Sequence, residues 1–183
     1  MKKFLSNTIF KIIGWKVDSN IDTNLVKKAV LVSAPHTSNW DFFLMLFGVW
    51  KMNVNVNFMI KDSFFVFPTG NILNWLGGVP VNRSKARNVV SQISDKLKNK
   101  EIQYLVISAE GTRSYTEKWK SGFYRIAQKS DAPLYFGFID YRKKVVGISK
   151  EFKMTGDYDN DLVEIKKYFS KVTPKFPELF SYK

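Results

Sequence analysis

The sequence predicts an α/β fold: a single domain with a largely parallel central sheet flanked by helices, and an amphipathic helix at the N-terminus. Short runs of β-branched and aromatic residues alternate with segments whose apolar residues recur at helical spacing, as in parallel strands joined by helices. The 183 residues, 45% of them hydrophobic, suffice for one core and are few for two. We expect one domain over 1–183, with an amphipathic helical segment (1–20), a core (28–150) and a C-terminal helix with a tail (157–183).

The first elements follow from local patterns in chain order. Residues 4–15 carry apolar side chains at helical spacing between lysines and predict an amphipathic helix. The β-branched run over 28–33 predicts a buried strand. A helix is expected to begin at Ser38 or Asn39, since both are good N-cap residues and apolar residues continue beyond Asp41.

The middle of the chain repeats this alternation. Residues 55–60 predict a strand, and residues 71–76 predict a helix that two following glycines end. A brief strand is expected over 79–82 and an amphipathic helix over 84–98, where apolar residues are spaced by four. Residues 103–108 form the clearest strand pattern in the chain and lead into a polar, glycine-containing turn.

The last third predicts a helix, a hairpin and a second helix. The second half of 118–129 has helical apolar spacing. Residues 134–140 and 144–149 predict two strands, and the polar residues between them indicate a hairpin. Asp159 or Asn160 is expected to cap a final helix, which precedes an irregular, proline-containing tail.

Charge and aromatic content narrow the class of partner. The formal net charge of +13 favours nucleic acid, a membrane surface or substrates that carry phosphate. Sixteen phenylalanines and five tryptophans beside many lysines are typical of surfaces at the lipid headgroup level, although an aromatic core explains them equally well. The segment 1–20 accordingly either faces a membrane or covers the edge of the core.

Several features of the chain indicate where the protein resides. No apolar run approaches the roughly 18 to 20 residues needed to cross a bilayer. The N-terminus begins like a signal peptide, but polar residues interrupt its apolar region and no cleavage site follows. We expect a cytoplasmic protein that binds peripherally to the inner face of the membrane.

The only histidine, His36, is the first candidate for acid/base chemistry near neutral pH. Asp41 can accept a hydrogen bond from one ring nitrogen and leave the other free to take a proton from a hydroxyl. On one regular helix the two side chains would point roughly 140° apart, so His36 is expected in the loop before the helix. The absence of cysteine excludes thiolate catalysis and disulfides, and with one histidine no metal is expected.

Other polar residues follow other predicted strands. Arg83 and Glu110 come at strand ends, as His36 does, and the carboxyl ends of parallel strands meet at one edge of a sheet. Arg83 and Arg113 are suited to bidentate recognition of phosphate. Glu110 would hold Arg113 in place or accept a hydrogen bond from a polyol substrate, and Gly111 permits close approach of the backbone.

Four ordered blocks carry a resemblance to a known family. They are His-Thr-Ser-Asn-Trp-Asp at 36–41, Gly-Gly-Val-Pro-Val-Asn-Arg at 77–83, Glu-Gly-Thr-Arg-Ser at 110–114 and Ala-Pro-Leu at 132–134. Together they resemble the glycerolipid acyltransferases, and most closely the 1-acyl-sn-glycerol-3-phosphate (lysophosphatidic acid) acyltransferases of phospholipid biosynthesis. The blocks span more than half of the chain.

The resemblance implies roles for the residues already singled out. His36 would be the general base that deprotonates the acceptor hydroxyl, and Asp41 would orient it. The residues that would bind the glycerol phosphate of a lysophospholipid acceptor are Arg83, Glu110, Gly111, Thr112 and Arg113. The acyl donor would be acyl-coenzyme A or acyl carrier protein, with no cofactor, and the enzyme would work at a membrane surface.

Some positions depart from the family pattern and leave the acceptor open. Pro35 stands where many members have Asn, Ser108-Ala109 where an aromatic-Pro pair is common, and Pro80 where Phe is common. Another lysolipid or an amino-acid lipid is therefore an alternative acceptor. A hydrolase that activates water through His36 and a basic nucleic-acid-binding domain are the rival functions, although no nucleic-acid motif is present. Residues 64–67 would be the floor of an acyl-chain pocket.

Overall fold

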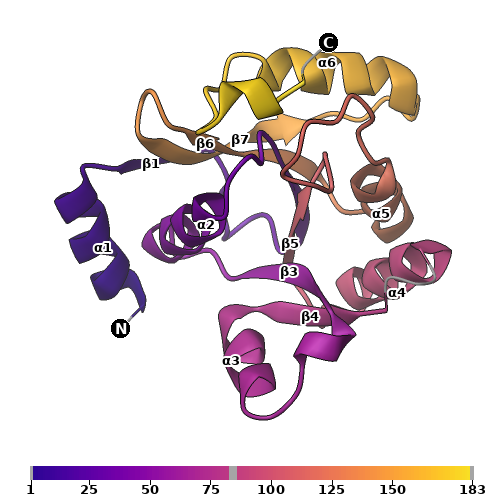
Figure 1. Ribbon diagram of the computed structural model, residues 1–183. Helices are drawn as coiled ribbons and strands as arrows, with labels where there is room; N and C mark the ends of the chain where they lie inside the picture. Colours follow the sequence, from indigo (N-terminus) through magenta and orange to yellow (C-terminus); the bar gives the residue numbers. More distant parts are fainter. Residues whose placement is uncertain (1, 83–85, 182–183) are drawn as a thin grey trace.

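A seven-stranded sheet with the order β1-β7-β6-β2-β5-β3-β4 forms the centre of the protein (Figure 1). The computed structural model describes residues 2–82 and 86–181, and the side chains of all of these except 86–88. The strands are β1 (Lys16–Ser19), β2 (Ala29–Ser33), β3 (Val56–Lys61), β4 (Gly78–Val81), β5 (Tyr104–Ser108), β6 (Leu134–Asp140) and β7 (Val145–Phe152). The helices are α1 (Lys2–Ile13), α2 (Trp40–Lys51), α3 (Thr69–Leu76), α4 (Ala86–Lys98), α5 (Gly122–Ser130) and α6 (Tyr158–Phe169), with short 3-10 helices η1 (Asp62–Phe64) and η2 (Pro177–Leu179).

The sheet is largely parallel, which confirms the predicted fold class. Strands β4, β3, β5, β2 and β6 run in one direction. Strand β7 is antiparallel to β6, as the predicted hairpin requires, and β1 pairs parallel with β7 at the edge. The carboxyl ends of β2, β3 and β5 therefore lie at one edge of the sheet.

Helices cover both faces of the sheet (Figure 1). Side chains alternate between the two faces along a strand, and β2 sends Val30 and Val32 into the cluster formed with α4, α5 and α6. Its Ala29 and Leu31 belong to the cluster formed with α2 on the other face. The central strand is thus buried from both sides, as its unbroken apolar run predicts.

The N-terminal segment differs from the prediction of one helical unit over 1–20. Helix α1 ends at Ile13 because Gly14 adopts φ +71°, and residues 16–19 form the edge strand β1. Nothing in the polar sequence of β1 signals a strand, since its stability comes from pairing with β7, which lies far along the chain.

Helix α1 also turns its apolar stripe outward. Its buried residues are Ser6 and Phe10, and Phe10 packs in a cluster with Leu44 of α2. By contrast, Phe4 and Ile12 are 79% and 77% exposed. Helix α1 therefore packs through Phe10 and leaves its most apolar stripe largely exposed, and the interpretation that this stripe faces a membrane stays a prediction. No helix in the described part of the chain is both long and apolar enough to cross a bilayer.

The last helix begins slightly earlier than predicted. Asp157, rather than Asp159 or Asn160, is its N-cap, and the Asp157 carboxylate accepts hydrogen bonds from the backbone N–H groups of both those residues. Three of the four residues at 157–160 have capping side chains, so the sequence left the choice open. The tail is irregular apart from η2.

Candidate functional site

Two neighbouring strands bring the blocks at 36–41 and 110–114 together. Strands β2 and β5 pair in parallel with Ser33 opposite Ser108, and the N–H of Ala109 donates to the carbonyl of Ser33 at 3.1 Å. The loops that follow the two strands therefore leave the sheet side by side. This places His36 next to Glu110, as the strand-end argument predicted.

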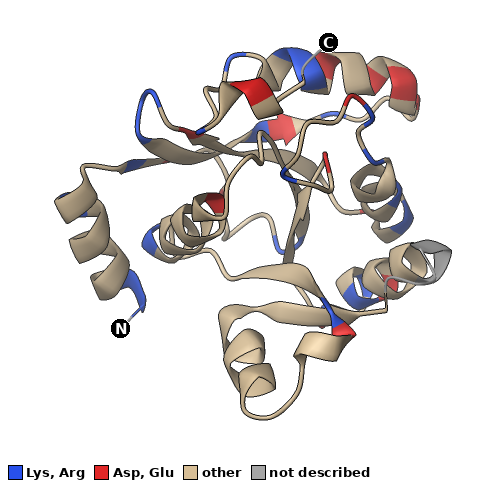
Figure 2. Ribbon diagram, viewed as in Figure 1, with Lys and Arg blue, Asp and Glu red and all other residues tan. Residues whose placement is uncertain are grey.

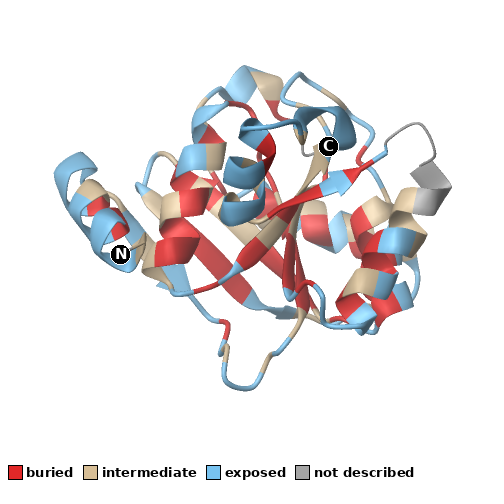
Figure 3. Ribbon diagram, turned by 90° about the horizontal axis from the view of Figure 1, so that it is seen from below, coloured by how far each residue is buried: buried red, intermediate tan, exposed pale blue. Residues whose placement is uncertain are grey.

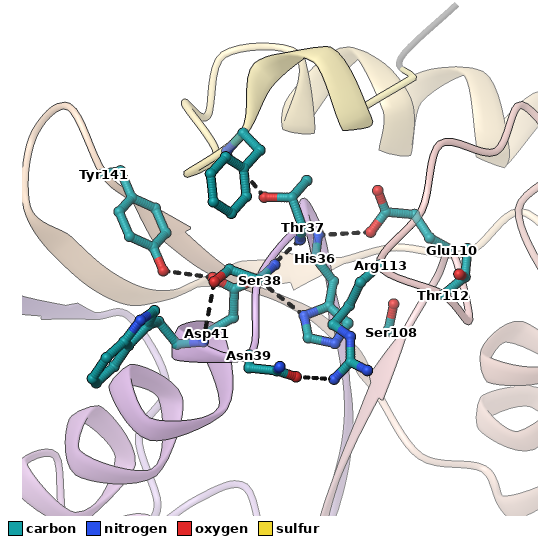
Figure 4. Close-up of polar contacts among 12 residues, drawn as sticks. His36, Thr37, Ser38, Asn39, Asp41, Ser108, Glu110, Thr112, Arg113 and Tyr141 are labelled. Carbon is teal, nitrogen blue, oxygen red and sulfur yellow. Dashed lines mark hydrogen bonds and ion pairs between the residues drawn. The ribbon is translucent and has the colours of Figure 1, made fainter.

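His36 and Asp41 form a hydrogen-bonded pair (Figure 4). His36 lies in the loop and Asp41 in the first turn of α2, and the His36 Nδ1 atom is 3.0 Å from Asp41 Oδ2. The same oxygen accepts the backbone N–H groups of Thr37 and Ser38 at 3.0 and 2.9 Å. The loop thus wraps around the carboxylate and fixes the imidazole in one orientation.

A third residue, Tyr141, completes the surroundings of Asp41. Its hydroxyl donates to Asp41 Oδ1 at 2.6 Å (Figure 4). Its ring packs edge-on against that of Trp15, with the ring centres 5.2 Å apart. Burial by itself would raise the pKa of Asp41, but hydrogen bonds from His36, Tyr141 and the Ser38 backbone outweigh it and lower that pKa. Burial and the bond to Asp41 raise the pKa of Tyr141, which stays a neutral donor.

Sequence reasoning missed Tyr141 because it lies 100 positions after Asp41, in the turn between β6 and β7. No local pattern connects the two residues. Only the pairing of β6 beside β2 brings the turn to the site.

The second ring nitrogen of His36 is available for chemistry. With Nδ1 donating to an ionised Asp41, the ring is the tautomer whose Nε2 carries a lone pair. Among the described residues Nε2 has no hydrogen-bond partner, and the side chain is 29% exposed. A hydroxyl that reaches this nitrogen can be deprotonated there.

Glu110 holds the His36 loop through a hydrogen bond to its backbone. It is only 3% exposed, and its Oε2 accepts the His36 backbone N–H at 2.7 Å. Burial raises the pKa of Glu110 to about 8, the His36 bond opposes the rise, and the negative charge of Asp41 adds to it. The side chain thus holds the histidine loop, and its role in acceptor binding stays a prediction.

The rest of the block at 110–114 lies near the surface beside the His36 loop. Arg113 is exposed, and its guanidinium donates to the Oδ1 of Asn39, which joins the two loops (Figure 4). Gly111 has φ +68°, a conformation that glycine adopts without strain. The Thr112 hydroxyl accepts the Ser114 N–H at 3.1 Å and shapes the turn.

The remaining predicted site residue, Arg83, lies outside the described residues. In the part of the chain that the structure describes, no three side chains of the metal-binding types are grouped closely enough to hold an ion.

A hollow of about 330 Å³ opens beside the pair. Residues from α1, α2, the β6–β7 turn and the tail line it, namely Ile13, Trp15, Trp40, Leu44, Tyr141, Lys144 and Lys175. Tyr141 lines this largely apolar hollow and also donates a hydrogen bond to Asp41, so its side chain lies between the hollow and the His36–Asp41 pair.

Comparison with known proteins supports the fold and identifies the family. The structure is similar to the crystal structure of the 1-acyl-sn-glycerophosphate (LPA) acyltransferase PlsC from Thermotoga maritima, with a TM-score of 0.62. The match covers 93% of this chain and 74% of that chain at 18% sequence identity, which shows a shared fold. No curated protein matches in sequence. The family model described as Acyltransferase matches residues 16–136, and because this is more than half of the chain, the protein belongs to the acyltransferase family and is an acyltransferase.

Proposed function

We propose that the protein transfers a fatty acyl group from a thioester donor to the hydroxyl of a lysophospholipid such as 1-acyl-glycerol-3-phosphate, in phospholipid biosynthesis. One observation carries the proposal: the Nδ1 of His36 is bound by an ionised carboxylate, and its Nε2 is exposed at the sheet edge. The sequence has no cysteine, and among the described residues no serine or threonine hydroxyl is hydrogen-bonded to His36 Nε2, so the acceptor's own hydroxyl is the attacking group.

The reaction then follows from the pair. His36 Nε2 takes the proton of the acceptor hydroxyl while the oxygen of that hydroxyl attacks the thioester carbonyl. Asp41 stabilises the imidazolium that forms. A C–O bond forms, the C–S bond breaks, and the imidazolium returns the proton to the leaving thiolate. The three hydrogen bonds to Asp41 from Thr37, Ser38 and Tyr141 keep this carboxylate ionised and in place.

Charge and apolar surface support the choice of substrates. The guanidinium of Arg113 lies beside His36 and is suited to the phosphate of an acceptor, with Arg83 as a second candidate from the sequence (Figure 4). The hollow beyond Tyr141 offers apolar surface to an acyl chain. The outward apolar stripe of α1 and its lysines fit peripheral binding to the inner face of a membrane, where such acceptors reside.

A mass-spectrometric assay of the purified protein tests the proposal. Lysophosphatidate, other lysophospholipids and an amino-acid lysolipid are each offered with acyl-coenzyme A and with acyl carrier protein as donor. We expect an acylated phosphate-bearing lipid as the product, and His36→Ala should abolish it while the fold persists by circular dichroism. Accumulation of free fatty acid would indicate a hydrolase, and full activity of the His36→Ala variant would refute the mechanism.

A further inference from the structure

A long uncharged segment lies between β3 and α4. From Ser63 to Asn82 the sequence contains no charged residue, although 25% of the whole chain is charged. In the fold this stretch comprises the end of η1, helix α3 and strand β4. In Figure 2 it is drawn in tan, without the blue and red of charged residues. Strand β4 and its buried side chains explain part of this composition.

The remainder of the segment is exposed and strongly apolar. Phe67 is 88% exposed, and four further side chains are more than half exposed, namely Phe64, Val66, Ile72 and Trp75. Exposed residues also dominate α3 in the view from below (Figure 3). A contiguous apolar patch of this kind marks an interaction surface in a soluble domain. Phe64 and Phe67 point outward, so the expectation that residues 64–67 form a pocket floor is wrong for this structure.

Local hydrogen bonds hold these side chains on a defined frame. The hydroxyl of Thr69 donates to the carbonyls of Phe64 and Val66 at 3.0 and 2.8 Å, and the N–H of Gly70 donates to Val66 at 2.7 Å. At the other end, α3 stops at Gly77, where an added Cβ would lie 2.2 Å from the carbonyl oxygen of Val56. The patch is therefore a shaped surface supported by the sheet.

The patch is continuous with α1 and bordered by lysines. The ammonium of Lys2 donates to the Trp75 carbonyl at 3.1 Å and lies 4.3 Å from the centre of the Trp75 ring. This contact joins the start of α1, with its exposed Phe4, to the end of α3. Lys61, next to the exposed Asp62, borders the patch at the end of β3. Aromatic rings with lysines around them are complementary to the boundary between acyl chains and anionic headgroups.

We propose that residues 64–75 form a second membrane-docking element, which acts together with α1 on a bilayer that contains anionic lipid. Phe64, Phe67 and Trp75 enter the headgroup boundary, and Lys2 and Lys61 meet the lipid phosphates. Because β3 ends at the same sheet edge as β2, the η1 end of this element lies at the edge that holds His36. Trp75 and Lys2 lie at the opposite edge, beside the start of β3, so the element docks along its length. The inference rests on the proposed function only in taking the acceptor to be a membrane lipid.

Vesicle flotation of the full chain tests this element. The probes are vesicles of phosphatidylcholine alone and of phosphatidylcholine with phosphatidylglycerol. We expect wild type to bind the anionic vesicles and the double variant Phe64→Ser/Phe67→Ser to bind at least about tenfold more weakly, since two apolar rings leave the lipid. Leu25→Ser is the matched control, because Leu25 is 79% exposed in a loop outside the patch, and it should bind as wild type does.

Two further measurements separate the alternatives. If the double variant floats as well as wild type, or if light scattering shows a wild-type dimer that the variant loses, the lipid assignment is overturned. Acyl transfer to a short-chain, water-soluble acceptor should persist in the double variant, while transfer to vesicle-bound acceptor falls. If wild type transfers to neither acceptor, the proposed function fails, yet the flotation result still decides the docking element.

Discussion

The buried carboxyl of Glu110 should make the stability of the protein depend on pH in an unusual direction. Burial raises the pKa of Glu110 from 4.5 to about 8 in the folded protein. Between these values the folded state holds one proton more than the unfolded state, so stability falls as pH rises, by up to about 1.4 kcal/mol per pH unit. The whole effect is on the order of 5 kcal/mol at alkaline pH.

The substitution Glu110→Gln isolates this effect. The amide oxygen of Gln can still accept the His36 N–H, while the titrating group is gone. We expect the variant to resemble wild type in stability near pH 5 and to be more stable by several kcal/mol, about 4 as an order of magnitude, near pH 8.

Urea denaturation of both proteins between pH 5 and pH 8 measures the difference. Other titrating groups are common to both proteins and cancel to first order. Glu178→Gln, at an exposed position, serves as the control for the same change of side chain outside the core. A difference for Glu110→Gln that does not grow with pH would refute the assignment of a buried, proton-holding carboxyl.

Three further predictions concern the site. Asp41→Asn should lower kcat by roughly 10³- to 10⁴-fold with the fold retained, since the imidazole loses its ionised partner; steady-state kinetics with circular dichroism check this. Tyr141→Phe should cost about 1–3 kcal/mol of stability near neutral pH, because Asp41 Oδ1 loses a donor, and less in acid, because the fold lowers the pKa of Asp41 less in the variant; urea denaturation at neutral and acid pH checks this, and an equal loss at both contradicts it. Arg113→Ala should raise KM for a phosphate-bearing acceptor by at least about tenfold, with Arg113→Lys restoring part of it, whereas equal effects on an acceptor without phosphate would contradict a phosphate contact.

The sequence alone determined the features that depend on local patterns. Apolar periodicity identifies the alternating strands and helices because it reports which side of each element is buried. The spacing of His36 and Asp41 across a loop and a first helical turn is also local, and it predicted their contact correctly. The order of the strand ends then placed Glu110 beside His36 through the general geometry of parallel sheets.

Only the tertiary structure decided which distant groups meet. Tyr141 reaches Asp41 because β6 lies beside β2, and β1 exists because β7 offers it an edge; neither pairing leaves a periodic signal in the chain. The same holds for burial, since the apolar stripe of α1 is compatible with core or surface in the sequence, and only the packing of Phe10 against α2 shows that the other face is buried. From the sequence, Glu110 is a candidate ligand for the substrate. The structure shows that its side chain is buried and bonded to the His36 backbone. Local patterns specify which faces are apolar, but long-range packing determines what covers them.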